Sequence, residues 1–202
     1  MLMPFVGRVA ELRRLKALLS AGRNVVVTGA FGSGRTSLVR QFAAETRRRV
    51  VFLDPSQSRA AARAMVARIA CVPRAPVLVL DDVARVTPQR IRLLREIAQR
   101  DDCRLVAIAE RSLPPDDLLR LRAALGAAAM LRVGPLPLAA VEACLAAAVE
   151  AHGLGWTREE IQGTARATHG FALGVRLTLE DALVRRSRAP VARPGGAIRR
   201  MR

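Results

Sequence analysis

Tyrosine is absent from this chain of 202 residues, and aromatic side chains make up 3% of it. Recognition of single-stranded nucleic acid by base stacking depends on such side chains, so that mode of binding is disfavoured. The three cysteines and two histidines lie far apart, and their spacing matches neither a CxxC pair nor a zinc site. We therefore expect no metal site of that type, and we expect a reducing, cytoplasmic location.

Long apolar runs are also missing. No stretch of about 18 residues is free of charged side chains, as a membrane-spanning helix would require. The first twelve residues, MLMPFVGRVAEL, contain no apolar segment of signal-peptide length. We expect neither a membrane span nor a secretory signal.

The charge balance is strongly basic. Lysine and arginine total 34 against 17 acidic residues, which gives a formal net charge of +17. Lys16 is the single lysine, so nearly all of this charge comes from arginine. Such a charge favours polyanions, either nucleic acid or an acidic protein partner, and a well-solvated basic surface is the open alternative. Residues 185–202 combine seven arginines with prolines and glycines, and we expect a disordered basic tail there.

The first two thirds of the chain alternate short apolar runs with amphipathic segments. Each apolar run reads as a buried strand and each amphipathic segment as a helix. The expected strands are 24–29, 49–54, 77–82, 104–110 and 129–136, and the expected helices are 8–21, 34–45, 56–70, 88–100 and 116–125. Strands separated by helices indicate an α/β fold with a parallel sheet covered on both faces.

After Pro137 the strand signal disappears. Segments 138–153, 157–170 and 171–186 all have helical character, and Thr157 followed by Glu160 predicts a capping box. We expect a small helical subdomain. The predicted division is therefore an α/β nucleotide-binding domain over 1–135, a helical lid over 136–184 and the basic tail over 185–202.

The stretch VVVTGAFGSGRTSL, residues 25–38, has the form of a phosphate-binding loop between a strand and a helix. Glycines let the backbone wrap closely and aim its N–H groups at phosphate oxygens, and the helix that follows contributes its positive N-terminal end. A hydroxyl after the basic residue is the expected Mg²⁺ ligand. The nucleotide-binding residues expected here are Gly29, Gly32, Ser33, Gly34, Arg35, Thr36 and Ser37, of which Thr36 is also the metal ligand.

Arg35 departs from the usual pattern, which has lysine at this position. Arginine keeps the positive charge, but its planar guanidinium prefers forked contacts where lysine offers a compact point charge. Three interpretations follow. Arg35 replaces lysine with some loss of affinity or rate, or it holds nucleotide without useful hydrolysis, or the site is vestigial.

The stretch VLVLDDV, residues 77–83, supplies the acidic half of such a site. Its apolar residues indicate a central strand, and the acids come at the carboxyl end, where ligands lie in parallel α/β sheets. Asp81 is the expected Mg²⁺ ligand. Asp82 is the expected catalytic residue that orients or deprotonates the attacking water.

These two motifs resemble the Walker A and Walker B motifs of the AAA+ and signal-transduction (STAND, NB-ARC-like, origin-recognition-like) P-loop ATPases. Residues 4–12, PFVGRVAEL, resemble the segment that lies against adenine in those families, which implies an adenine contact for Val6. Residues 105–113 resemble the strand that ends in a sensing arginine. Arg111 falls on that arginine, which implies contact with the γ-phosphate, and Glu110 replaces the usual hydroxyl.

The helical region resembles the lid of the same families. Residues 168–183 are similar to the lid helix with a Gly-x-Pro-Leu motif, with Ala172 in place of proline, which implies a nucleotide contact for Ala172. Arg176, one turn later, is a loose candidate for a second sensing arginine. Arg120 and Arg122 lie in the region where an arginine finger occurs in AAA+ assemblies.

The resemblance implies an ATP-binding protein with Mg²⁺ as cofactor, acting as a slow ATPase and nucleotide-controlled switch, and forming a homo-oligomer when ATP binds. The preference for ATP over GTP depends on this resemblance, because no Asn-Lys-x-Asp stretch is present. Two alternatives stay open. One is a DNA-associated AAA+ assembly ATPase of the transposition or replication-initiation type, and the other is a degenerate P-loop interaction module without hydrolysis.

Overall fold

The computed structural model of the chain describes residues 7–53, 76–83, 86–100 and 102–188. Three features expected from the sequence lie outside these ranges. They are the adenine contact at Val6, the helix over 56–70 and most of the basic tail.

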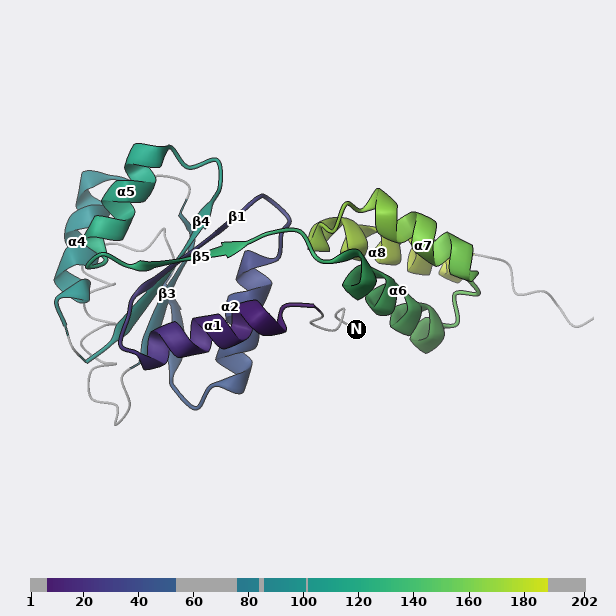
Figure 1. Cartoon of the computed structure of the whole chain (residues 1–202), viewed down its shortest axis with the longest axis horizontal. Coiled ribbons are helices and arrows are strands. Elements are labelled where there is room, and N and C mark those ends of the chain that lie inside the picture. The colour runs from purple at the N-terminus through teal and green to yellow at the C-terminus, as the bar shows by residue number, and fades with distance from the viewer. Residues whose placement is uncertain (1–6, 54–75, 84–85, 101, 189–202) are drawn as a thin grey trace, which may run out of the picture.

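The part of the chain before α6 (Leu138–His152) is built around a parallel sheet with the strand order β2-β3-β4-β1-β5 (Figure 1). The strands are β1 (Val25–Gly29), β2 (Val50–Leu53), β3 (Val77–Val83), β4 (Arg104–Glu110) and β5 (Ala129–Val133). All five residues of β1 are buried, because β4 and β5 flank this strand and helices cover both of its faces. The predicted α/β fold with a parallel sheet is confirmed.

Helices cover both faces of the sheet (Figure 1). Those within the described ranges are α1 (Val9–Ser20), α2 (Arg35–Glu45), α4 (Pro88–Ala98) and α5 (Pro115–Ala124). On one face α1 and α2 pack their leucines and Phe42 onto the valines of the central strands. On the other face α4 and α5 enclose a second apolar cluster around Leu105 and Leu121. Successive side chains of a strand point to opposite faces, which explains why one set of strands supplies two cores.

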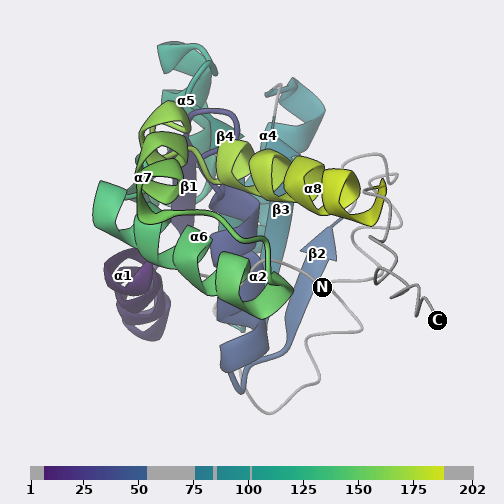
Figure 2. The same cartoon turned by 90° about the vertical axis from the view of Figure 1, so that its right-hand side faces the viewer.

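Three helices follow β5 and form a separate group beside the sheet (Figures 1 and 2). They are α6 (Leu138–His152), α7 (Arg158–Ala167) and α8 (Ala172–Arg188). Their core is a third cluster that includes Val141, Leu145 and Val175. The Thr157 hydroxyl accepts from the Glu160 backbone while the Glu160 carboxylate accepts from the Thr157 backbone, so the predicted capping box is confirmed.

Within the described ranges, no helix is both long and apolar enough to cross a membrane.

Candidate functional site

The glycine-rich loop runs from the end of β1 at Gly29 to the start of α2 at Arg35. Gly32 and Gly34 have φ of +74° and +90°, a region that side chains with a Cβ rarely adopt. A Cβ on Gly29 would lie 2.5 Å from the Val133 carbonyl oxygen and 2.6 Å from the Ser33 hydroxyl oxygen. Glycine is therefore required at these positions by backbone conformation or by space.

Ser33 lies inside this loop with 1% of its surface exposed. Its hydroxyl oxygen is buried and has no hydrogen-bond partner within the described part of the chain. Buried polar groups almost always have a hydrogen-bond partner. The unpaired Ser33 hydroxyl is therefore consistent with a loop that binds a polar ligand. The conformation and the polar groups of the loop thus fit a phosphate-bearing ligand.

Thr36 and Asp81 are brought together by the fold, although β4 lies between the strand that precedes the loop and the strand that carries the acid. The Thr36 hydroxyl donates to an Asp81 carboxylate oxygen at 3.0 Å. Hydroxyl and carboxylate oxygens are the ligands that Mg²⁺ prefers. This pair fits the metal ligand set that the sequence predicts.

The sheet register is irregular between Leu80 and Val83, the segment that carries both aspartates. Bulges occur beside functional sites, where they redirect a side chain. Asp82 is part of β3, and its side chain lies outside the part of the chain that the structure describes.

The Arg35 side chain is directed at the end of β4. Its Nη1 donates to the Ala109 carbonyl oxygen at 2.6 Å, and its Nη2 lies 3.9 Å from a Glu110 carboxylate oxygen. The other Glu110 oxygen accepts from the Ser112 hydroxyl at 3.0 Å. The sequence marked Arg35 and Glu110 as separate departures, and it gave no signal that the two side chains face each other.

The helical group of α6, α7 and α8, called the lid from here on, contacts the loop directly. The backbone N–H of Leu173, in the first turn of α8, donates to the Gly32 carbonyl oxygen at 3.0 Å. A Cβ on Gly34 would lie 3.4 Å from the Cβ of Ala172, so Ala172 packs beside the loop. The predicted nucleotide contact at Ala172 therefore falls on a residue that borders the glycine loop.

The arginines expected from the sequence have different surroundings. Arg111 is exposed, and its backbone N–H donates to the Gly29 carbonyl oxygen at 2.9 Å, which joins the end of β4 to the start of the loop. Arg176 is half exposed and lies 3.4 Å from Glu180 on its own helix. Arg120 pairs with Asp117 at 3.5 Å, and Arg122 donates to the Ala128 carbonyl oxygen at 3.3 Å. Arg111 is thus joined to the loop through its backbone, whereas the other three have local partners.

Solved structures resemble this arrangement across most of the chain. The RuvB Holliday junction branch migration motor of Thermotoga maritima matches 91% of this chain and 65% of its own, with a TM-score of 0.64 at 19% identity. The Orc1 protein of Aeropyrum pernix, solved in complex with DNA, matches 93% of this chain and 62% of its own, with a TM-score of 0.64 at 17% identity. The chain thus spans about two thirds of the length of these structures.

The chain has the AAA+ P-loop ATPase fold. At this level of identity the likeness concerns the fold. No protein-family model matches the chain, and no curated protein sequence matches it.

Within this AAA+ fold, Arg8 is a residue that sequence reasoning missed. It is 4% exposed, and one guanidinium nitrogen donates both to the Ser33 carbonyl oxygen in the glycine loop, at 3.0 Å, and to the Gly134 carbonyl oxygen after β5. The other terminal nitrogen pairs with Glu11 at 2.7 Å. One buried cation therefore connects α1, the loop and the segment that leads to the lid. An arginine three residues before a glutamate was the only local signal.

A cavity of about 420 Å³ lies at the carboxyl ends of β1, β4 and β5, where ligands bind in parallel sheets. Among its lining residues are Gly29, Ser33, Glu110 and Arg111, together with Phe171 from the segment before α8. Four residues singled out from the sequence thus border one cavity, and Phe171 brings the segment before α8 to its edge.

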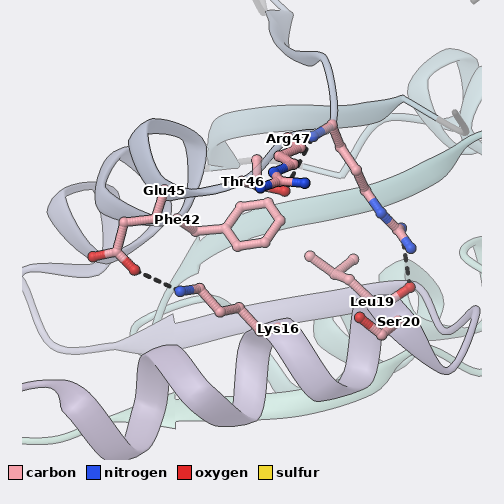
Figure 3. Close-up of a pocket in the computed structure, with 8 residues that line it drawn as sticks. Lys16, Leu19, Ser20, Phe42, Glu45, Thr46 and Arg47 are labelled. Carbon is pink, nitrogen blue, oxygen red and sulfur yellow. Dashed lines mark hydrogen bonds and ion pairs between the residues drawn. The ribbon is translucent and has the colours of Figure 1, made fainter.

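A second cavity, of about 240 Å³, lies between α1 and α2 beside the Lys16–Glu45 ion pair (Figure 3). Arg48 closes part of it by donating to the Leu19 carbonyl oxygen at 3.2 Å. It lies near the amino ends of the strands and, unlike the larger cavity, borders none of the loop residues.

Proposed function

We propose that this chain is an ATP-binding protein of the AAA+/STAND type that hydrolyses ATP slowly with Mg²⁺ and acts as a nucleotide-controlled switch. The observation that carries the proposal is the Thr36–Asp81 hydrogen bond beside a glycine loop with an orphaned serine hydroxyl. In this proposal residues 1–135 form the nucleotide-binding domain and 136–184 the lid, and the protein acts in the cytoplasm.

Each part of the site has a proposed role. The loop amides from Gly29 to Thr36 and the Arg35 guanidinium hold the phosphates, with Ser33 and Ser37 as further hydroxyl groups. Thr36 and Asp81 hold Mg²⁺, which neutralises developing charge on the phosphates when it is bound.

The remaining residues complete the chemistry. Asp82 orients or deprotonates the attacking water, and Arg111 interacts with the γ-phosphate. In this proposal Val6 contacts the adenine, and Ala172 contributes a further nucleotide contact.

The switch depends on the contacts between the lid and the loop. Leu173 is bonded to Gly32, and Arg8 joins Ser33 to Gly134, so two connections run from the phosphate-binding loop towards the lid. A ligand that moves the loop changes both connections, and the lid responds as a hinged body.

Titration with a fluorescent ATP analogue and Mg²⁺, competed with unlabelled ATP and GTP, tests the proposal. We expect binding in the micromolar range that ATP competes better than GTP, followed by slow release of phosphate. Asp81→Ala is expected to abolish phosphate release, with Asp116→Ala, an exposed aspartate on α5, as the matched control. Failure of the folded protein to bind at millimolar nucleotide would overturn the proposal in favour of a degenerate interaction module.

A DNA-associated assembly ATPase is the second candidate function. The net charge of +17 favours it, and the neighbours include a Holliday junction motor and an Orc1 protein solved with DNA. Binding mainly through phosphates would be insensitive to sequence and would weaken steeply with salt. A homo-oligomer that forms with ATP and binds duplex DNA at low salt would support this candidate, and absence of binding at low salt would exclude it.

A further inference from the structure

Two departures from the P-loop pattern face each other in this structure. Arg35 stands where the pattern has lysine, and Glu110 ends β4, where the resemblance to STAND ATPases implies a hydroxyl. The fold places Nη2 of Arg35 3.9 Å from Oε1 of Glu110. Because the two side chains meet at one point of the site, they are better understood together than as two separate losses.

The geometry suits arginine in particular. A guanidinium presents its donors in a fixed planar fork, whereas lysine offers a single ammonium. Arg35 uses one arm of the fork on the Ala109 carbonyl oxygen, at 2.6 Å, and turns the other towards Glu110. The Glu110 carboxylate is oriented in turn by the Ser112 hydroxyl, which donates to its second oxygen at 3.0 Å.

The pair is also partly withdrawn from water. The Arg35 side chain is 13% exposed and the Glu110 side chain 34% exposed. Solvent screens such a pair less than it screens a fully exposed one, so the carboxylate influences where the guanidinium rests.

We propose that Glu110 is a positioning residue that holds Arg35 at the end of β4, so that nucleotide phosphates must displace Glu110 as the partner of Arg35. This proposal rests on the proposed function, because it assigns Arg35 to phosphate binding. Glu110 then weakens nucleotide binding in two ways, by engaging the cation and by placing a negative charge beside the phosphates. A triphosphate carries more negative charge than a diphosphate, so the penalty is larger for ATP than for ADP.

The position of the pair links it to the lid. Glu110 and the adjacent Arg111 line the 420 Å³ cavity together with Phe171, and the Arg111 backbone is bonded to Gly29 at the start of the loop. Release of Arg35 from Glu110 thus changes the cavity that the lid borders.

Glu110→Gln tests the proposal, because it removes the charge and keeps the shape. We expect this variant to bind the ATP analogue about three- to tenfold more tightly, with a smaller gain for the ADP analogue. In an Arg35→Lys background the same change is expected to give a smaller gain, since the fork that faces Glu110 is gone. Glu159→Gln, which removes an exposed charge from α7, is the matched control and is expected to change neither affinity.

A second readout needs no nucleotide. In urea unfolding, a double-mutant cycle of Glu110→Gln and Arg35→Met, which removes the cation, is expected to give a coupling of about two- to fivefold in the unfolding equilibrium constant. If no variant binds nucleotide but this coupling is present, the proposed function fails while the Arg35–Glu110 pairing stands. Unchanged or weaker ATP binding by Glu110→Gln in a protein that binds nucleotide, or absence of coupling, overturns the inference.

Discussion

Arg8 is the residue on which the connection between loop and lid most depends. Its guanidinium is 4% exposed and serves the carbonyl oxygens of Ser33 and Gly134. Arg8→Ala would leave both oxygens without this buried donor. We therefore expect the free energy of unfolding to fall by about 2–4 kcal/mol. Urea unfolding measures the loss. Arg13→Ala on the exposed face of α1 is the matched control, for which we expect a change within about 0.5 kcal/mol.

Nucleotide affinity separates two roles for this arginine. We expect Arg8→Ala to weaken binding of the ATP analogue as well, because Ser33 belongs to the loop that holds the phosphates. A variant that is destabilised but binds nucleotide as tightly as the wild type would limit Arg8 to a structural role.

The residues of the candidate site differ in how far the sequence could predict them. The loop glycines, Thr36 and Asp81 belong to short motifs, so local spacing was sufficient to mark them. The contacts of Arg8, and the contact between Arg35 and Glu110, join side chains that meet only after the sheet is formed. No local pattern encodes such long-range contacts.

At the scale of elements, the α8 N-terminus rests on the glycine loop. Gly32 has φ of +74°, and a Cβ there would lie 2.9 Å from the Cβ of Leu173. Gly32→Ala therefore combines backbone strain with a clash against the lid. We expect the free energy of unfolding to fall by at least about 1–2 kcal/mol, and nucleotide binding to become weaker.

Gly126→Ala is the matched control for that substitution. Gly126 has φ of +67°, and no atom lies within 4 Å of the position of its Cβ among the described residues. The Gly126→Ala variant therefore has the backbone strain of a positive φ without a steric clash. Equal losses for the two variants in urea unfolding would show that α8 does not rest on the loop in solution.

The order of the helices and strands that the structure describes was predictable, because apolar runs and 3.6-residue periodicity are local signals. The strands that the structure describes agree with the predicted segments within a few residues at each end, as β4 at Arg104–Glu110 shows. The strand order was not predicted. The insertion of β4 between β1 and β3 results from pairing between segments that are far apart in the chain.

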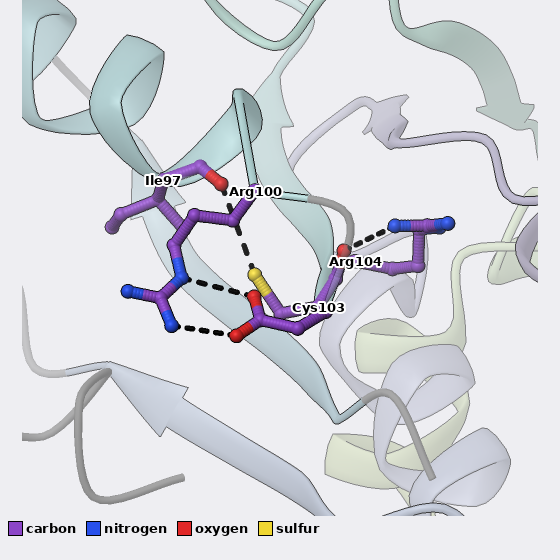
Figure 4. A network of polar contacts seen from close by, with 5 residues as sticks. Ile97, Arg100, Cys103 and Arg104 are labelled. Atoms are coloured by element: carbon purple, nitrogen blue, oxygen red, sulfur yellow. Dashed lines mark hydrogen bonds and ion pairs between the residues drawn. The ribbon is translucent and has the colours of Figure 1, made fainter. Parts of the chain in front are cut away.

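At the scale of the whole molecule, the two cysteines that the structure describes are both buried, and they belong to two different cores. Cys103 belongs to the apolar cluster under α4 and α5, where its Sγ lies 3.8 Å from the Ile97 carbonyl oxygen beside the Arg100–Asp102 ion pair (Figure 4). Cys144 belongs to the smaller cluster of the lid. Burial raises the pKa of both thiols, so each reacts slowly until local opening exposes it.

The lid is expected to open more often than the sheet, because its cluster contains fewer buried side chains. At pH 8 we therefore expect a thiol reagent to label Cys144 several times faster than Cys103, as followed by peptide mass spectrometry on the wild-type protein. Mg²⁺ and ATP are expected to slow the labelling of Cys144 more than that of Cys103, since a ligand that contacts both loop and lid stabilises the docked lid. Equal labelling rates that nucleotide slows equally would mean that the lid and the sheet open as one unit, and the lid could not then act as a separate switch.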